Sequence, residues 1–254
     1  MLLPRVIPCL LLKGLGLVKG VQFKDHRYIG DPMNAVQIFN TMEADEMLFL
    51  DILATAENRI PDLDLIQKIA DQSLMPFGVG GGIQNTTHIR DILRAGAEKV
   101  CLNTYALKNP DLITEAANIF GRQSLVVSID IKKHKKGHYE VYTNCGSKLF
   151  SEDLQGVCVL MQEKGAGEIL LNSIDRDGTM SGYALEIISE MSKYINVPLI
   201  ICGGAGTIRD LKDGIHIGHA SAVAAGSMFV FHGPRRAVLI SYPDAKELAE
   251  IRGE

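Results

Sequence analysis

The chain has 254 residues, of which 46% are hydrophobic and 22% are charged, and its formal net charge is −4. This composition is typical of a soluble globular protein, and its mildly acidic balance gives no reason to expect nucleic acid or an anionic membrane as a partner. The N-terminal segment has neither the features of a signal peptide nor an apolar run of the ~18 residues that a membrane span needs, so we expect a cytoplasmic protein.

Eight short apolar runs alternate with longer segments of helical period. The predicted strands begin near Arg5, Glu46, Pro76, Glu98, Leu125, Glu168, Val197 and Ser221. Helical segments such as 63–74 and 185–195 lie between them. This alternation in a chain of ~250 residues predicts an α/β fold, a single (β/α)8 TIM barrel.

The second half of the chain repeats features of the first half. The segment "FGVGGGI" at 77–83 resembles "IICGGAG" at 200–206, and "CLNTYA" at 101–106 resembles "AAGSMF" at 224–229. The two pairs are separated by the same number of residues. The first strand, "VIPCLL", aligns with "LVVSID" of the fifth strand. We therefore predict one domain built from two half-barrels, approximately 1–122 and 123–254.

The chain also has five cysteines, an odd number without a C-x-x-C pair. Three of them lie in apolar strand runs, which indicates reduced buried thiols rather than disulfides or a zinc site. We predict no metal and no cofactor.

Glycine-rich strand ends occur once in each half. Glycines let backbone N–H groups approach an anion closely, and the following helix N-terminus adds partial positive charge. One such cluster is equally typical of a tight turn, but two related by the repeat predict a ligand with a phosphate at each end. The candidate residues are Gly82, Asn103 and Thr104 in the first half, and Gly204, Gly226 and Ser227 in the second.

Several acids lie where predicted strands end, on the side of a barrel that carries active sites. Asp51 ends the second strand, Asp130 ends the fifth, and Asp175 and Asp177 follow the sixth. They could serve as acid–base groups or cap loops and form ion pairs. Leu11 occupies the position on the first strand that corresponds to Asp130 on the fifth.

The segments "FLDI", "VGGGI", "LNT", "SIDRDGT" and "GGAG" occur in the order found in the HisF-type cyclase subunit of imidazole glycerol phosphate synthase. The resemblance covers essentially the whole chain. The "CLLLK" segment more closely resembles HisF-like paralogues associated with surface-polysaccharide amidotransferases. The resemblance implies a duplicated half-barrel, a bisphosphate substrate, and ammonia supplied by a partner glutaminase for a lyase-cyclase reaction of histidine biosynthesis.

The resemblance also implies roles for individual residues. The six glycine-cluster residues named above would bind phosphate, and Lys19 matches the family's lysine in the loop after the first strand. Asp130 matches one catalytic aspartate, whereas the other falls on Leu11. Because removing a positioned acid or base typically costs ~10²–10⁴ in rate, we expect weak cyclase activity.

Four charged residues lie at the other end of the predicted strands, at the starts of the first, second, fourth and sixth. They are Arg5, Glu46, Lys99 and Glu168. Taken alone, they predict a salt-bridge plug that closes the barrel floor. The resemblance implies instead the gate through which ammonia enters from a glutaminase docked on this face. Glu46 and Asp51 differ in strand parity, so the sequence leaves their relative orientation open.

The basic run "KKHKKGH" at 132–138, followed by the alternating "YEVYTN", could clamp a phosphate, but a hairpin is the favoured interpretation.

Three functions remain open. The leading hypothesis is an ammonia-conducting barrel subunit of a glutamine-dependent amidotransferase complex. Its partners would be a HisH-type glutaminase on the N-terminal face, a third amidotransferase protein that aminates a surface sugar for lipopolysaccharide, and a phosphorylated small molecule. The second hypothesis is an active cyclase that uses Asp130 and a replacement acid, and the third is a non-catalytic regulator that binds a phosphorylated ligand.

Overall fold

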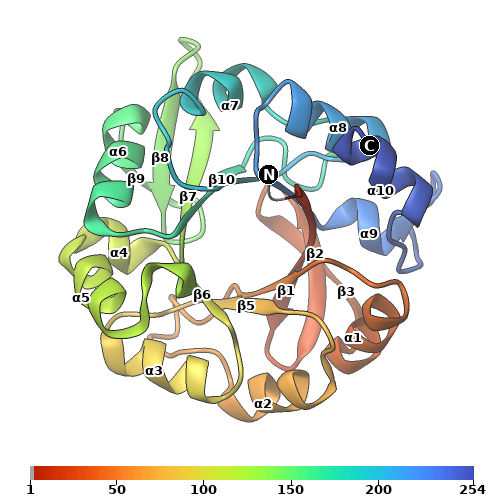
Figure 1. The fold of residues 1–254 in the computed structure, drawn as a ribbon, viewed down its shortest axis with the longest axis horizontal. Helices are drawn as coiled ribbons and strands as arrows, with labels where there is room; N and C mark the ends of the chain where they lie inside the picture. The colour runs from red at the N-terminus through yellow and green to blue at the C-terminus, as the bar shows by residue number, and fades with distance from the viewer. Residues whose placement is uncertain (1–2) are drawn as a thin grey trace.

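The computed structural model describes residues 3–254, and its central feature is a closed barrel of parallel strands surrounded by helices (Figure 1). Strand β12 pairs with β1 and strand β7 pairs with β10, so the sheet has no open edge within the barrel. The predicted (β/α)8 TIM barrel is confirmed. The barrel strands are β1 (Arg5–Lys13), β4 (Met47–Asp51), β5 (Phe77–Gly80), β6 (Lys99–Leu102), β7 (Leu125–Lys133), β10 (Glu168–Ser173), β11 (Leu199–Cys202) and β12 (Ala222–Ala225).

The surrounding helices begin where the sequence supplies caps. Asp31 accepts hydrogen bonds from two backbone N–H groups of the first turn of α1, and Pro32 follows directly as its first residue. Thr207 and Asp210 form a capping box at the start of α8. The outer helices are α1 (Pro32–Thr41), α2 (Leu63–Gln72), α3 (Thr86–Arg94), α4 (Thr104–Lys108), α5 (Asp111–Phe120), α6 (Leu154–Lys164), α7 (Leu185–Met191), α8 (Ile208–His216), α9 (Ser227–Val230) and α10 (Ala245–Arg252).

Strand alternation divides the apolar side chains into two groups. The larger group packs between the barrel and the helices and includes Phe49, Phe77 and Ile129. The smaller group fills the barrel interior, and we call it the lumen cluster: Ile7, Cys9, Leu48, Cys101, Val126, Leu170, Ile200, Cys202, Ala222 and Ala224. Apolar and thiol side chains therefore separate the two ends of the barrel.

This division shows which side chains of β4 point into the barrel. Leu48 belongs to the lumen cluster and Leu50 packs against it, so Glu46 shares the inward parity of both residues. Asp51 has the opposite parity. Its carboxylate accepts hydrogen bonds from the backbone N–H groups of Leu53 and Ala54 in the turn that follows the strand.

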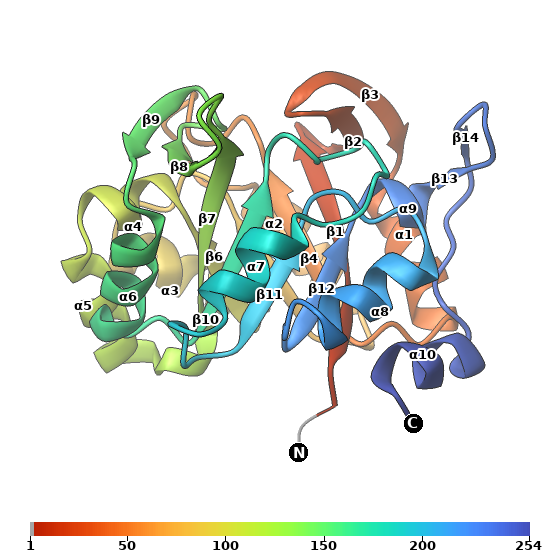
Figure 2. The same cartoon turned by 90° about the horizontal axis from the view of Figure 1, so that it is seen from above.

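Two hairpins extend the barrel on one side, opposite the side where α10 lies (Figure 2). Strands β2 (Gly16–Val21) and β3 (Lys24–Gly30) follow β1, whereas β8 (Tyr139–Thr143) and β9 (Lys148–Ser151) follow β7. The hairpin predicted around 132–138 is confirmed by the pairing of β7 with β8. The pairing of β2 with β3 was not predicted, because the glycine-rich segment 14–20 lacks a clear strand alternation.

The two halves begin alike. Strands β1 and β7 both have nine residues, and each is followed by two antiparallel strands. This similarity is consistent with the predicted half-barrel repeat, which stays a prediction. A small hairpin of β13 (Phe231–His232) and β14 (Ala237–Val238) precedes α10. Among residues 3–254, no helix has the length and apolar character needed to cross a membrane.

Candidate functional site

The four charged residues at the strand starts meet at one end of the barrel, and we call them the floor ring. The Arg5 guanidinium forms an ion pair with Glu46, and its Nη2 lies 3.1 Å from Glu168 Oε2. Lys99 Nζ lies 2.9 Å from both oxygens of Glu46 and 3.0 Å from Glu168 Oε1. Each cation therefore contacts both anions, and the ring is neutral as a whole.

The floor ring lies between solvent and the barrel interior. The side chains of Arg5 and Lys99 are 25% and 15% exposed, whereas those of the two glutamates are more deeply buried. Burial by itself would lower the pKa of Arg5, but the charges of Glu46 and Glu168 outweigh this effect and raise it. Arg5 is therefore held in its charged form, and the ring closes the barrel below the lumen cluster.

A cavity of about 200 Å³ lies at the opposite end, and we call it the mouth cavity. It is bordered by both halves of the barrel. Leu11, Asn103, Asp130 and Asn172, together with Lys19 of the β2–β3 hairpin, are among its lining residues. The cavity therefore brings together the predicted catalytic position, the predicted loop lysine and one of the two predicted phosphate cradles.

Asp130 is buried in this cavity, with only 8% of its surface exposed. The Nδ2 group of Asn172 donates to its Oδ1 at 3.1 Å, and the Nδ2 group of Asn103 donates to its Oδ2 at 3.2 Å. Burial raises the pKa of Asp130 to about 7, although the two amide hydrogen bonds oppose this shift; the nearby charge of Asp177 adds to it. Asp130 can therefore exchange a proton near neutral pH.

Leu11 lies on β1 and borders the same cavity without an ionisable group. The other candidate acids have partners of their own. Asp51 forms an ion pair with Arg59 at 2.6 Å, and Asp177 forms one with Lys19 at 2.8 Å. Asp130, by contrast, receives its side-chain hydrogen bonds from two asparagines. The two neighbouring acids that border the cavity are thus engaged elsewhere.

Asp175 is directed away from the mouth cavity. Its Oδ2 accepts a hydrogen bond from the backbone N–H of Lys133 at 2.7 Å, on the outer side of the β7–β8 hairpin. It borders a separate, shallow depression there, together with Arg176 and Glu186. The structure thus separates Asp175 from the other acids that the sequence grouped at the mouth.

Lys19 is buried, and its ammonium lies near the second predicted cradle. A methyl group added to Gly226 would lie 3.1 Å from Lys19 Nζ. Burial alone would lower the pKa of Lys19, but the charge and hydrogen bond of Asp177 raise it above its ordinary value. The buried lysine is therefore cationic and sits where an anion at this cradle would benefit from it.

The polar groups of the first cradle already have partners within the protein. The backbone N–H of Gly82 donates to Thr55 Oγ1 at 3.3 Å. The hydroxyl of Thr104 donates to Asn103 Oδ1 at 3.0 Å and accepts from the backbone N–H of Asn144 at 2.9 Å. An anion bound there would have to replace some of these contacts.

The second cradle has an unpaired hydroxyl. Ser227 Oγ is buried without a hydrogen-bond partner, and the same holds for Asn172 Oδ1 and Asp177 Oδ2 in the part of the chain that the structure describes. Gly204 has a φ of +120°, and a methyl group there would lie 2.1 Å from the backbone oxygen of Gly182. All three atoms come from the second half of the chain, and a water molecule or an ion could serve as partner to each.

Sequence reasoning missed Asn172 and Arg59. Asn172 lies four residues after Glu168 on the same strand, so both side chains point to the same side of the sheet. Because Glu168 was expected to point into the barrel, the sequence could have placed Asn172 there too, beside Asp130. Arg59 lies in the turn region after β4, and its distance along the chain from Asp51 gave no signal.

Comparison with known proteins identifies the family of the chain. The family described as "Histidine biosynthesis protein" matches residues 5–234. The chain belongs to this family and is of the HisF type. It shares 48% identity over 244 residues with "Putative imidazole glycerol phosphate synthase subunit hisF2" of Pseudomonas aeruginosa, covering 96% of this chain and 97% of that protein.

Two further HisF-type relatives cover nearly the same span. "Putative imidazole glycerol phosphate synthase subunit HisF" of Leptospira borgpetersenii is 46% identical over 248 residues, covering 97% of this chain and 98% of that protein. "Imidazole glycerol phosphate synthase subunit HisF" of Alkaliphilus metalliredigens is 41% identical over 232 residues, covering 91% and 92% respectively.

Proposed function

We propose that this HisF-type chain is the ammonia-conducting barrel subunit of a glutamine-dependent amidotransferase complex and that its own cyclase activity is weak. One observation carries the proposal: the floor ring is complete, whereas the mouth has Leu11 where a second acid would face Asp130. The nitrogen-entry side thus has all the charged groups expected for a gate, and the reaction side lacks one of two acid–base groups.

The lumen cluster supports passage of neutral ammonia. Its side chains are apolar or thiol, so they offer little compensation for the desolvation of an ammonium ion, whereas an uncharged molecule loses far less. A glutaminase docked on the floor face would release ammonia next to the floor ring. Movement of the Lys99 or Arg5 side chain would then open the way to the mouth.

The mouth supports only half of the cyclase chemistry. Ring closure and carbon–nitrogen cleavage need one group that donates a proton and another that accepts one. Asp130, with a pKa of about 7, suits either role. Leu11 can supply neither, and Asp51 and Asp177 are held by Arg59 and Lys19.

The proposal also includes an acceptor for the ammonia. We propose that a third protein at the mouth aminates a sugar for the bacterial surface, in the cytoplasm, and that a phosphorylated small molecule binds the cradles. The resemblance of "CLLLK" to surface-polysaccharide paralogues supports the sugar. The buried Ser227 hydroxyl, and the Lys19 ammonium close to the neighbouring Gly226, support the anionic ligand.

An active cyclase is the second candidate. Asp130 has the buried setting and near-neutral pKa of a general acid or base, and the Alkaliphilus relative is named as the synthase subunit without qualification. Turnover of the bisphosphate substrate with ammonium salt, at a rate comparable to that of a two-aspartate HisF enzyme, would favour this function.

Reconstitution with a HisH-type glutaminase tests the leading proposal. We expect the two proteins to co-purify, and glutamine hydrolysis to rise when the barrel is added. Lys99→Met should change the extent to which the barrel raises glutamine hydrolysis. Lys135→Met, which replaces an exposed lysine on the mouth side, should leave this activation unchanged. Absence of both complex formation and activation would rule the proposal out.

A further inference from the structure

The β7–β8 hairpin brings two histidines together at its tip. His134 and His138 flank a three-residue turn in which Gly137 has a φ of +98°. The backbone N–H of His134 donates to the oxygen of His138 at 2.8 Å, and that of Gly137 donates to the oxygen of His134 at 2.9 Å. The two rings lie with their centroids 4.6 Å apart. The turn therefore fixes both backbones, and the histidines face each other across the hairpin.

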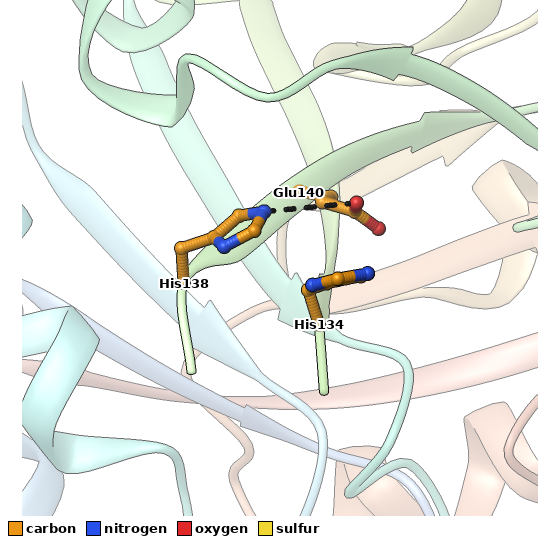
Figure 3. Close-up of side chains that lie close together, drawn as sticks. All are labelled: His134, His138 and Glu140. Atoms are coloured by element: carbon orange, nitrogen blue, oxygen red, sulfur yellow. Dashed lines mark ion pairs between the residues drawn. The ribbon is translucent and has the colours of Figure 1, made fainter. Parts of the chain in front are cut away.

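Glu140 is the second residue of β8 and follows His138 by two positions, so the two side chains lie on the same side of the hairpin. His138 Nε2 is 3.8 Å from Glu140 Oε1, and the Tyr142 hydroxyl donates to Glu140 Oε2 at 2.8 Å. One ligand atom from each of His134, His138 and Glu140 lies within 4.8 Å of the other two (Figure 3). Two imidazoles from the ends of the turn and one carboxylate from β8 therefore converge.

The neighbouring lysines do not neutralise this carboxylate. Lys132 Nζ lies over the Tyr142 ring at 5.8 Å from its centroid, and Lys133 pairs with Glu186 at 3.2 Å. Lys135 and Lys136 are on the exposed turn. Within residues 3–254, the ion pair of Glu140 is with His138 alone, although the Glu140 side chain is only 9% exposed. Lys132 stands opposite Glu140 in the pairing of β7 with β8, but among the described residues its ammonium forms no ion pair with this carboxylate, which leaves the nearly buried carboxylate suited to a bound metal ion.

We propose that His134, His138 and Glu140 bind a divalent late first-row metal ion such as Zn²⁺ or Co²⁺. Imidazole and carboxylate are preferred ligands of these ions at about 2.0–2.2 Å, so small side-chain rotations on the fixed hairpin would bring the three atoms around one ion. The Nδ1 lone pair of His134, which accepts from the backbone N–H of Lys136 at 3.2 Å, is available to the metal in exchange for that contact. Tyr142 would hold Glu140 in place from behind.

The site is separate from the chemistry at Asp130 and does not depend on the proposed function. Four residues along β7 at ~3.3 Å each place His134 about 13 Å from Asp130. Three protein ligands leave a coordination position open, so the ion would fix the hairpin tip beside the mouth and could accept a water or an anionic group there.

Titration of the tag-free chain with CoCl₂ and ZnCl₂ tests the proposal. We expect one equivalent of Co²⁺ to produce a visible absorption band and one equivalent of Zn²⁺ to give a single-site calorimetric isotherm. Tyr142→Phe should weaken binding about tenfold, since outer partners of metal ligands are worth ~10–100-fold in affinity. His134→Gln, His138→Gln and Glu140→Gln should each weaken it by more.

His219→Gln is the matched control, because His219 is an exposed histidine outside the cluster. It should bind as the unmodified chain does. Circular dichroism of each variant should show an unchanged fold, since both histidines lie at the hairpin tip and Glu140→Gln keeps the size of the buried side chain. The proposal is overturned if the unmodified chain shows no stoichiometric binding, or if His138→Gln and Glu140→Gln bind both ions as tightly as His219→Gln.

Discussion

The two ends of the barrel differ in how their buried polar groups are partnered. At the floor, Arg5, Glu46, Lys99 and Glu168 satisfy one another in a closed ring. At the mouth, Asn172, Asp177 and Ser227 each have a buried polar atom without a hydrogen-bond partner among residues 3–254. The floor is therefore complete without a ligand, whereas the mouth leaves groups for one. Under the proposed function, conduction of ammonia would need only the floor arrangement, whereas cyclisation would also need a second acid at the mouth.

The largest effect should come from restoring that acid. Leu11→Asp should raise the ammonium-dependent turnover of the bisphosphate substrate by ~10²–10⁴, because a positioned acid or base is worth about this much. Steady-state kinetics of both proteins would measure it, with Leu15→Asp, an exposed leucine in the β1–β2 turn, as the control. Equal turnover in Leu11→Asp and the unmodified chain would show that more than this side chain separates the mouth from an active cyclase.

The next effect concerns the floor. Lys99→Met leaves Glu46 and Glu168 facing each other with Arg5 as their shared cation, and should lower the free energy of unfolding by about 2–4 kcal/mol. This is below the ~3–5 kcal/mol expected for a fully buried pair, because Lys99 is 15% exposed. Urea unfolding would measure it against Lys135→Met. A loss no greater than that of the control would mean that the ring does not act as a unit.

A smaller effect should appear in the pH dependence of stability. The pKa of Asp130 is raised in the folded chain to about 7 from an ordinary value near 4, so folding favours its protonated form. Its stabilising contribution is complete below about pH 4 and is lost as pH rises to about 7, by at most ~1.4 kcal/mol per pH unit.

Asp130→Asn removes this titration. The stability of the unmodified chain relative to the variant should therefore fall between pH 5 and pH 7, as measured by urea unfolding at each pH. A difference that stays constant over this interval would contradict the burial-driven shift.

The smallest effect on stability should come from the mouth. Ser227→Ala removes a hydroxyl that has no partner, so the free energy of unfolding should change by less than about 0.5 kcal/mol. Binding of inorganic phosphate, measured by calorimetry, should nevertheless weaken by about tenfold, as expected for one hydrogen bond to a charged group. Unchanged phosphate binding would show that the second cradle does not hold an anion.

Sequence reasoning reached the barrel because eight apolar runs alternate with helical segments, and it named every member of the floor ring. It did not foresee that Asn172 and Asn103 share Asp130, since residues on neighbouring strands are brought together only by the register of the sheet. The orientation of Asp51 depends on whether the side chains of β4 alternate between the two faces without interruption from Glu46 onward. The sequence alone does not show this. The β2–β3 hairpin was missed because its pairing is set by β1 rather than by a local alternation.

One measurement tests the central claim most directly: the amount of cyclised product formed per glutamine hydrolysed, in a complex of this chain with a HisH-type glutaminase and the bisphosphate substrate. We predict steady glutamine hydrolysis with a ratio far below one, because under the proposed function ammonia would enter through the floor ring, while Leu11 at the mouth would supply no second acid for cyclisation. A ratio close to one would contradict the account.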